Sequence, residues 1–169
     1  GSQRTRIGTN ADGIADVLEA NVVVGSATYG VLLADPGTTL NIVDGNFIGT
    51  DPRRTLAMPN LLSGVGIANG ATANTIGGTA PGAGNLTSGN NGPGVSVLRI
   101  HPTNGSTMVP APDNVILGNR IGTDVTGTAV LANAGHGVLI GEPGTIVGGT
   151  AAGARNLIRG NAGTGNLIT

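Results

Sequence analysis

The feature that most constrains the fold of this chain is an internal repeat. The segment GNFIGTDPRRTLAMPNLLSGVGI, residues 45–67, returns 73 residues later as GNRIGTDVTGTAVLANAGHGVLI, residues 118–140. The Gly-Asn, Ile-Gly-Thr-Asp, Asn and Gly-Val positions of the two copies coincide. Repeats of this kind are typical of solenoids, in which each unit buries its apolar face against the next unit.

Three short phrases recur in a fixed order: Gly-Val-x-aliphatic, then a run centred on a branched aliphatic residue, then a run that opens with Asn. The first phrase begins at Gly30, Gly64, Gly94 and Gly137. The second is centred on Val43, Ile76, Ile116 and Val147. The third begins at Asn21, Asn46, Asn85, Asn119 and Asn156. One lap is therefore three short strands joined by loops of variable length, and about four and a half laps fit the chain.

Apolar residues alternate within these phrases, as they do in a β-strand with one buried face. In the Gly-Val phrases one face is uniformly apolar and is predicted to point inward. In the Asn phrases the predicted inward column is Val23, Ile48, Thr87, Ile121 and Ile158. The column that alternates with it contains an arginine and is predicted to point outward. Its members are Val22, Phe47, Leu86, Arg120 and Leu157.

This pattern predicts an all-β fold, a single right-handed parallel β-helix of about four to five coils with three short strands each. Helices need apolar residues three and four positions apart, and dense glycine destabilises them. An antiparallel sandwich has no reason to repeat three strands in a fixed order. Residues 1–169 are assigned to one domain, with Gly1 and Ser2 interpreted as the remnant of an expression tag.

Composition agrees with this fold and argues against several classes of function. Glycine supplies 32 of the 169 residues, and with one Phe, one Tyr and no Trp the core must consist of small branched aliphatic side chains. The net charge is −1 and no basic run is present, which argues against a nucleic-acid partner. No apolar run approaches the roughly 18 residues of a membrane span. The chain has no cysteine and therefore forms no disulfides.

The phrases NTIGGTAPGAGNLTSGN and IVGGTAAGARNLIRGN, together with the two long copies, resemble the parallel β-helix repeats of large bacterial secreted and cell-surface proteins. The resemblance extends from about Arg6 to Ile168. It implies a bacterial protein located outside the cell or on its surface. It identifies no function, because this fold hosts lyases, hydrolases, adhesins and spacers.

The asparagines that open the third phrase are interpreted as structural. At a corner, an Asn amide can bond the backbone and donate to the Asn of the next lap, so that the amides form a ladder. A row of ligand-binding amides is the functional alternative. Asp51 and Asp124, at the ends of the two Ile-Gly-Thr-Asp motifs, are interpreted as residues that cap their own loops. The glycines of these corners are expected to adopt positive φ.

The outward column is the candidate contact face for another chain or for a glycan. Exposed apolar residues in such a row usually have a role. The alternative is that the loops at residues 52–63 and 125–135 fold back over the column and cover it.

Asn10, Asp12 and Asp16 form the candidate metal site. They resemble the start of an Asp-rich calcium loop, although the later ligands of an EF-hand are missing. No cofactor other than calcium is expected.

For catalysis, the fifth residue after each Gly-Val glycine gives one column across four laps. Its members are Asp35, Asn69, Arg99 and Glu142. The two acids lie three laps apart, about 14 Å, which is too far for the paired carboxylates of a glycosidase. His101 and His136 have no evident partners in the sequence.

These observations favour a non-enzymatic structural or adhesive scaffold, part of a secreted or surface protein. The alternative is a carbohydrate-active β-helix, similar to a polysaccharide lyase or hydrolase, or one that binds a glycan. The ends of a solenoid expose unpaired strand edges, and the segment GNLIT ends within a strand phrase. We therefore expect self-association, end to end or side to side, or continuation in a longer chain.

Overall fold

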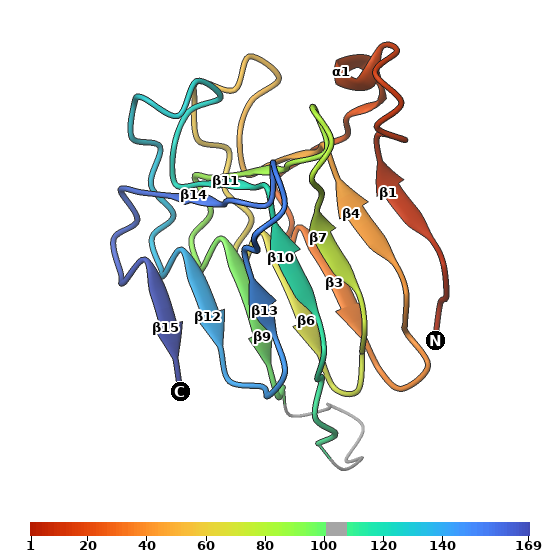
Figure 1. The fold of residues 1–169 in the computed structure, drawn as a ribbon. Helices are drawn as coiled ribbons and strands as arrows, with labels where there is room; N and C mark the ends of the chain where they lie inside the picture. The colour runs from red at the N-terminus through yellow and green to blue at the C-terminus, as the bar shows by residue number, and fades with distance from the viewer. Residues whose placement is uncertain (101–107) are drawn as a thin grey trace.

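The structure is a computed structural model and describes residues 1–100 and 108–169 (Figure 1). Within these residues the chain forms short β-strands and one short helix, α1 (Asp16–Glu19). The strands make up three parallel sheets of five strands each, which are named below after their first strands.

The β1 sheet consists of β1 (Arg6–Gly8), β4 (Ile42–Asp44), β7 (Thr75–Gly77), β10 (Val115–Leu117) and β13 (Ile146–Val147). The β2 sheet consists of β2 (Val22–Val23), β5 (Phe47–Ile48), β8 (Leu86–Thr87), β11 (Arg120–Ile121) and β14 (Leu157–Ile158). The β3 sheet consists of β3 (Val31–Ala34), β6 (Val65–Ala68), β9 (Val95–Leu98), β12 (Val138–Ile140) and β15 (Asn166–Ile168).

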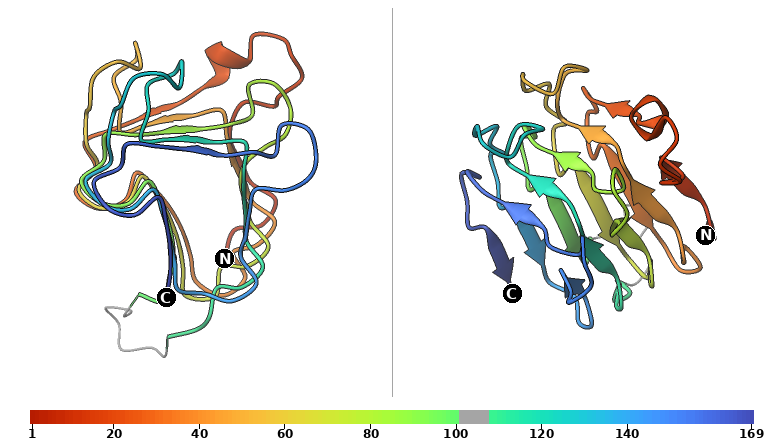
Figure 2. Two further views of the ribbon diagram at one scale, coloured as in Figure 1. Left: turned by 60° about the vertical axis from the view of Figure 1, so that its left-hand side comes forward. Right: turned by 45° about the horizontal axis from the view of Figure 1, so that its top comes forward.

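Each strand pairs in parallel with the strand three places later in the chain, so three consecutive strands complete one coil. The result is a parallel β-helix of five coils with the three sheets as its sides (Figures 1 and 2). This confirms the fold predicted from the repeats. The first and last coils are more complete than the repeat count indicates. The phrase of β1 lacks its corner Asn, and β15 has Asn166 where the Gly-Val phrase has valine.

The core is a stack of inward side chains along the solenoid. In the β3 sheet, Val65 pairs in register with Val95 and Val95 with Val138, and all three are buried. In the β2 sheet the middle of the inward column is fully buried, and its end members, Val23 and Ile158, are half-buried. Each buried branched aliphatic side chain stabilises the fold by about 1.5–3 kcal/mol, so the repeated stack replaces large aromatic residues.

Glycines turn the corners after the strands of the β2 sheet. Gly49 follows β5 and Gly122 follows β11, with φ of 88° and 85°. This is the left-handed region, which residues with a side chain rarely adopt, so the corners require glycine. The positive φ expected for the Ile-Gly-Thr-Asp glycines is confirmed, and the motif is the exit from a strand into a loop.

Candidate functional site

The five corner asparagines that precede the strands of the β2 sheet are hydrogen bonded to one another along the solenoid. Asn85 donates its backbone N–H and its Nδ2 to Oδ1 of Asn119, at 3.1 and 3.0 Å. The same two bonds join the other neighbouring members, which are Asn21, Asn46 and Asn156. Because the amides are used within the fold, they have little capacity left for a ligand.

Two further asparagine ladders occupy the other corners, and the sequence analysis missed both. The ladder before the β1 sheet consists of Asn41, Asn74 and Asn114. The ladder before the β3 sheet consists of Asn60, Asn90, Asn133 and Asn161. A fixed position in the sequence could have revealed both ladders. Asn41, Asn74 and Asn114 directly precede strands of the β1 sheet. The members of the Asn60 ladder each stand four residues before a Gly that precedes a strand of the β3 sheet.

Asp51 and Asp124 hold the loops that follow β5 and β11. Asp124 accepts hydrogen bonds from the Thr126 hydroxyl and from the backbone N–H of Ala129, and these lower the pKa of its carboxyl group. Asp51 accepts the backbone N–H of Leu56 at 2.8 Å, which is the largest cause of its lowered pKa. Both acids therefore act as loop caps.

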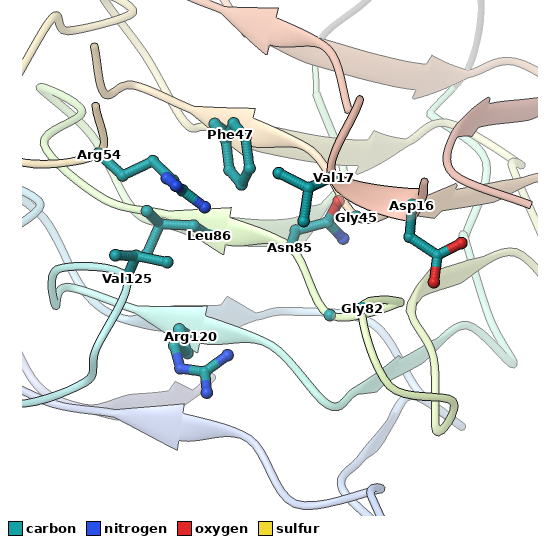
Figure 3. A pocket seen from close by; sticks show the side chains of 11 residues that line it. Asp16, Val17, Gly45, Phe47, Arg54, Gly82, Asn85, Leu86, Arg120 and Val125 are labelled. Carbon is teal, nitrogen blue, oxygen red and sulfur yellow. The ribbon is translucent and has the colours of Figure 1, made fainter. Parts of the chain in front are cut away.

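A groove lies on the outer face of the β2 sheet (Figure 3). Its floor is the outward column, in which Leu86 pairs in register with Phe47 on one side and Arg120 on the other. The loops after β5 and β11 border one side, and α1 with the turn at Gly82 borders the other. The cavity over β5 and β8 has a volume of about 250 Å³.

The loops cover part of the outward column. Leu86 is buried, Phe47 and Leu157 are half-buried, and Val22 and Arg120 are exposed. Arg54, from the loop after β5, lies with its guanidinium 4.9 Å from the centroid of the Phe47 ring. The middle of the column, at Phe47 and Leu86, is thus covered, whereas Val22 and Arg120 on either side of it stay open.

The groove contains arginines with no carboxylate partner in the described part of the chain. The ion pairs there are Arg6–Asp44 and Arg99–Glu142, and neither includes a residue of the groove. Nε of Arg54 is buried and has no hydrogen-bond partner among the described residues. Desolvated guanidinium groups favour an anion that can bind them in a bidentate way.

Arg120 also belongs to a second depression, further along the same face. This depression has a volume of about 420 Å³ and reaches Arg155 and Leu157. Both arginines are exposed. The groove and this depression together give the outer face of the β2 sheet a positive end over β11 and β14.

The acids of the proposed catalytic column are not gathered into one site. Glu142 is buried and accepts hydrogen bonds from Nε of Arg99 at 2.9 Å and from the backbone N–H of Ala111 at 3.1 Å. Oδ1 of Asn69 accepts a backbone N–H of the next coil at 3.0 Å. Asp35 is exposed. Two members of this column therefore meet, as an ion pair.

Asp44, on the outer face of β4, is the carboxyl group with the largest perturbation. It is buried, its Oδ2 is paired with Arg6, and its Oδ1 has no hydrogen-bond partner among the described residues. Burial raises the pKa of Asp44 from 3.8 to about 6, against the opposing effect of Arg6. Within residues 1–100 and 108–169, no three His, Cys, Asp or Glu residues lie close enough together to hold a metal ion.

Of the candidate calcium residues, Asn10 and Asp12 lie between β1 and α1, and Asp16 is the first residue of α1. Oδ1 of Asp12 accepts the backbone N–H of Ile14 at 2.8 Å, and Oδ2 accepts Nδ2 of Asn10 at 3.1 Å. Oδ1 of Asp16 accepts the hydroxyl of Thr9 at 3.0 Å. These carboxylates bond to their own loop, and the three residues stay an untested candidate for a calcium site.

His136 joins the last two coils, because its Nδ1 accepts the backbone N–H of Thr164 at 3.0 Å. His101 lies outside the described residues. In the part of the chain that the structure describes, no helix has the length and apolar character needed to cross a membrane.

The three parallel sheets place the chain in the class of parallel β-helix solenoids. Comparison with protein-family models, with curated proteins and with solved structures finds no match for it. Its function must therefore be inferred from the ladders, the groove and the strand edges themselves.

Proposed function

We propose that this chain is a non-enzymatic structural or adhesive scaffold, part of a secreted or surface protein of a bacterium. The observation that carries the proposal is that the recurring polar residues form hydrogen bonds within the fold. The corner asparagines bond one another, and Asp51 and Asp124 bond their own loops. The residues that differ between coils, including Phe47 and Arg120, line the groove. Recurring residues thus hold the fold and variable residues line a groove, which suits a stiff rod that presents one face to a partner.

A scaffold explains the carboxylates better than an enzyme does. Glycoside hydrolysis requires two free carboxylates about 5–9.5 Å apart across a substrate. Here Glu142 is bonded to Arg99 and to a backbone N–H, and Asp44 is paired with Arg6. Polysaccharide turnover that is lost in an Asp44→Asn variant would contradict the scaffold proposal.

The strand edges support end-to-end association of copies as part of this function. The strands of the first coil pair only with the second coil, and those of the fifth only with the fourth. In every asparagine ladder the donors face the later coil and the Oδ1 acceptors face the earlier coil. A second copy therefore continues the ladders only when its first coil stacks on the fifth coil of its neighbour. Such a head-to-tail contact repeats without closing.

Light scattering over a concentration series tests this association. Ile168 is in register with buried Ile140 but is 76% exposed, so it would be covered by the next copy. The average mass is expected to rise with concentration, and Ile168→Asp is expected to abolish the rise. Leu61→Asp is the control, because Leu61 is an exposed apolar residue between β5 and β6, in the second coil and away from both end strands. A strict monomer at every concentration would overturn the proposal.

Glycan binding is a second candidate function, favoured by the cavity over Phe47 and Leu86. The buried Nε of Arg54 in this cavity has no acceptor among the described residues, and an acidic sugar could supply one. Calorimetry with a uronic-acid oligosaccharide tests this candidate, with the methyl-esterified oligosaccharide as its neutral control. Binding of the acid form that is lost in Arg54→Met is expected, and absence of heat with both sugars would contradict it.

A further inference from the structure

We propose that two copies of this chain also pair side by side, in antiparallel orientation, through the outer faces of their β2 sheets. In each copy, residues 12–19, here called the α1 segment, would occupy the depression between Arg120 and Arg155 of the other copy. This pairing rests on the scaffold function proposed above and identifies a surface for it. That surface is distinct from the strand edges at the ends of the solenoid.

The first observation is an acidic and apolar segment that borders the groove. Asp12, Asp16 and Glu19 lie within residues 12–19, which contain no basic residue. Three large apolar side chains in the same segment face solvent. Ile14, Val17 and Leu18 are 73%, 60% and 87% exposed. A cluster of large exposed apolar side chains on a short segment usually marks an interaction site.

The second observation is a basic depression over the last two coils. Arg120 and Arg155 border it, and the half-buried Leu157 gives it an apolar floor. No ion pair of the described residues includes either arginine. Arginine accompanied by apolar surface is the composition typical of protein interfaces, where a guanidinium binds carboxylates in a bidentate way.

Within one copy these two regions do not form an ion pair among the described residues. Asp16 is next to the turn at Gly82, between β7 and β8 of the third coil, and it borders the groove together with Arg120 (Figure 3). The depression itself lies over β11 and β14, in the fourth and fifth coils. Its two arginines therefore remain without a carboxylate partner in the described part of one copy.

A twofold axis that reverses the solenoid direction places each acidic segment opposite the basic depression of its partner. The contact is then self-complementary, as a closed dimer requires. Parallel pairing would place like charges together, which costs several kcal/mol in typical interfaces. The exposed side chains of Ile14 and Leu18 would be removed from water over Leu157. Charge and apolar area thus select the same orientation.

A second copy fits this depression better than a saccharide does. A saccharide presents many hydroxyl groups, which need free amide or carboxylate partners. Asn119 is the amide side chain that borders the depression, and both its Nδ2 and its Oδ1 are engaged in the ladder. The arginines remain available to carboxylates.

Sedimentation velocity with charge-reversal variants tests the pairing. All variants carry Ile168→Asp, so that end-to-end stacking does not contribute. The parent is expected to form a dimer that dissociates as salt is raised, because the contact is largely ionic. Arg120→Glu is expected to weaken the dimer about tenfold or more. Arg4→Glu, an exposed arginine on the β1 side, is the matched control and should not weaken it.

A mixing experiment makes the outcome specific for the two surfaces. Arg120→Glu/Arg155→Glu and Asp12→Lys/Asp16→Lys should each be monomeric alone, and an equimolar mixture should regain the dimer. Leu18→Asn tests the apolar contribution without changing charge and should also weaken the parent dimer. A parent that stays monomeric at low salt, an Arg120→Glu variant that dimerises like Arg4→Glu, or a mixture that stays monomeric would each overturn the proposal. None of these outcomes bears on end-to-end association, which is measured with Ile168 intact.

Discussion

Asn85 donates two hydrogen bonds to one atom of Asn119, from its backbone N–H and from its Nδ2 to Oδ1. It also accepts two from Asn46 at its own Oδ1 and donates Nδ2 to the carbonyl of Val43. Every hydrogen-bonding group of this side chain is therefore used, and the side chain is buried. The ladder joins three coils through one residue, independently of the strand pairing.

We expect Asn85→Ala to lower the free energy of unfolding by about 3 kcal/mol, because it leaves buried groups of Asn46 and Val43 without partners. Asn21→Ala, at the exposed end of the same ladder, should cost less than about 1 kcal/mol. Urea denaturation followed by circular dichroism measures both. Equal losses for the two variants would show that the ladder does not stabilise the middle of the solenoid.

Thr87 marks a position where the core can be improved. Its side chain points inward between Ile48 and Ile121, and its hydroxyl is buried without a hydrogen-bond partner among the described residues. Thr87→Val removes this polar atom at nearly constant volume and is expected to raise the stability by about 1 kcal/mol or more.

The control for this substitution is Thr38→Val. The hydroxyl of Thr38 donates to the carbonyl of Ala34 at 2.6 Å, so its removal should destabilise the protein. Thermal melts distinguish the two cases. A Thr87→Val variant that melts lower than the parent would show that this hydroxyl has a partner, such as a water molecule.

The strands of each coil were predictable because the residues that identify a strand are adjacent in the sequence. Gly-Val and the inward aliphatic residues lie next to each other, so a period of two reveals the strand and its buried face. The Asn21 set was found because Asn directly precedes the strand in all five copies of its phrase, whereas in the Asn41 set the last copy has Thr145 in place of Asn. The ladder of Asn60 was missed because the three residues between it and Gly64 differ in each coil, which hides the constant offset.

The groove was not predictable, because it depends on how loops fold. Its outward column could be identified from alternation, but nothing in the sequence pattern relates Arg54 to Phe47. Their stacking follows from the hydrogen bonds of Asp51, which turn the loop back toward the sheet. The exposed apolar side chains of α1 also escape a period-two analysis, since they belong to no strand.

Asp124 allows a test of how the loops border the groove. Asp124→Ala removes the acceptor for the backbone N–H groups of Thr128 and Ala129, whereas Asp124→Asn retains one oxygen in the same place. Hydrogen exchange at these two amides is expected to accelerate strongly in the alanine variant and only modestly in the asparagine variant. Unchanged exchange in Asp124→Ala would show that the loop is held by other contacts.

Calcium is expected to have little effect on stability. The carboxylate of Asp12 is bonded to Asn10 and to the backbone of Ile14, so an ion would have to replace these hydrogen bonds. We expect neither heat in a calcium titration nor a shift in melting temperature. A shift that disappears in Asp12→Asn would instead establish a calcium site in this loop.

Asp44 should make stability decrease as pH rises through weakly acidic values. Its pKa is raised from 3.8 to about 6 by burial, so between these values the folded state holds a proton that the unfolded state has released. The contribution of Asp44 to the free energy of unfolding is therefore greatest below about pH 4. It falls by up to about 3 kcal/mol as the pH rises to about 6, at about 1.4 kcal/mol per pKa unit.

Asp44→Asn removes this titration and retains an oxygen that can accept a hydrogen bond from Arg6. The difference in unfolding free energy between the variant and the parent should grow in favour of the variant from pH 4 to pH 6 and then stay constant. Asp51 and Asp124 act in the opposite sense. Because folding lowers their pKa values, the stability that these two groups contribute is lost as the pH falls through their folded-state pKa values. A difference that is independent of pH would show that Arg6 keeps Asp44 ionised throughout this range.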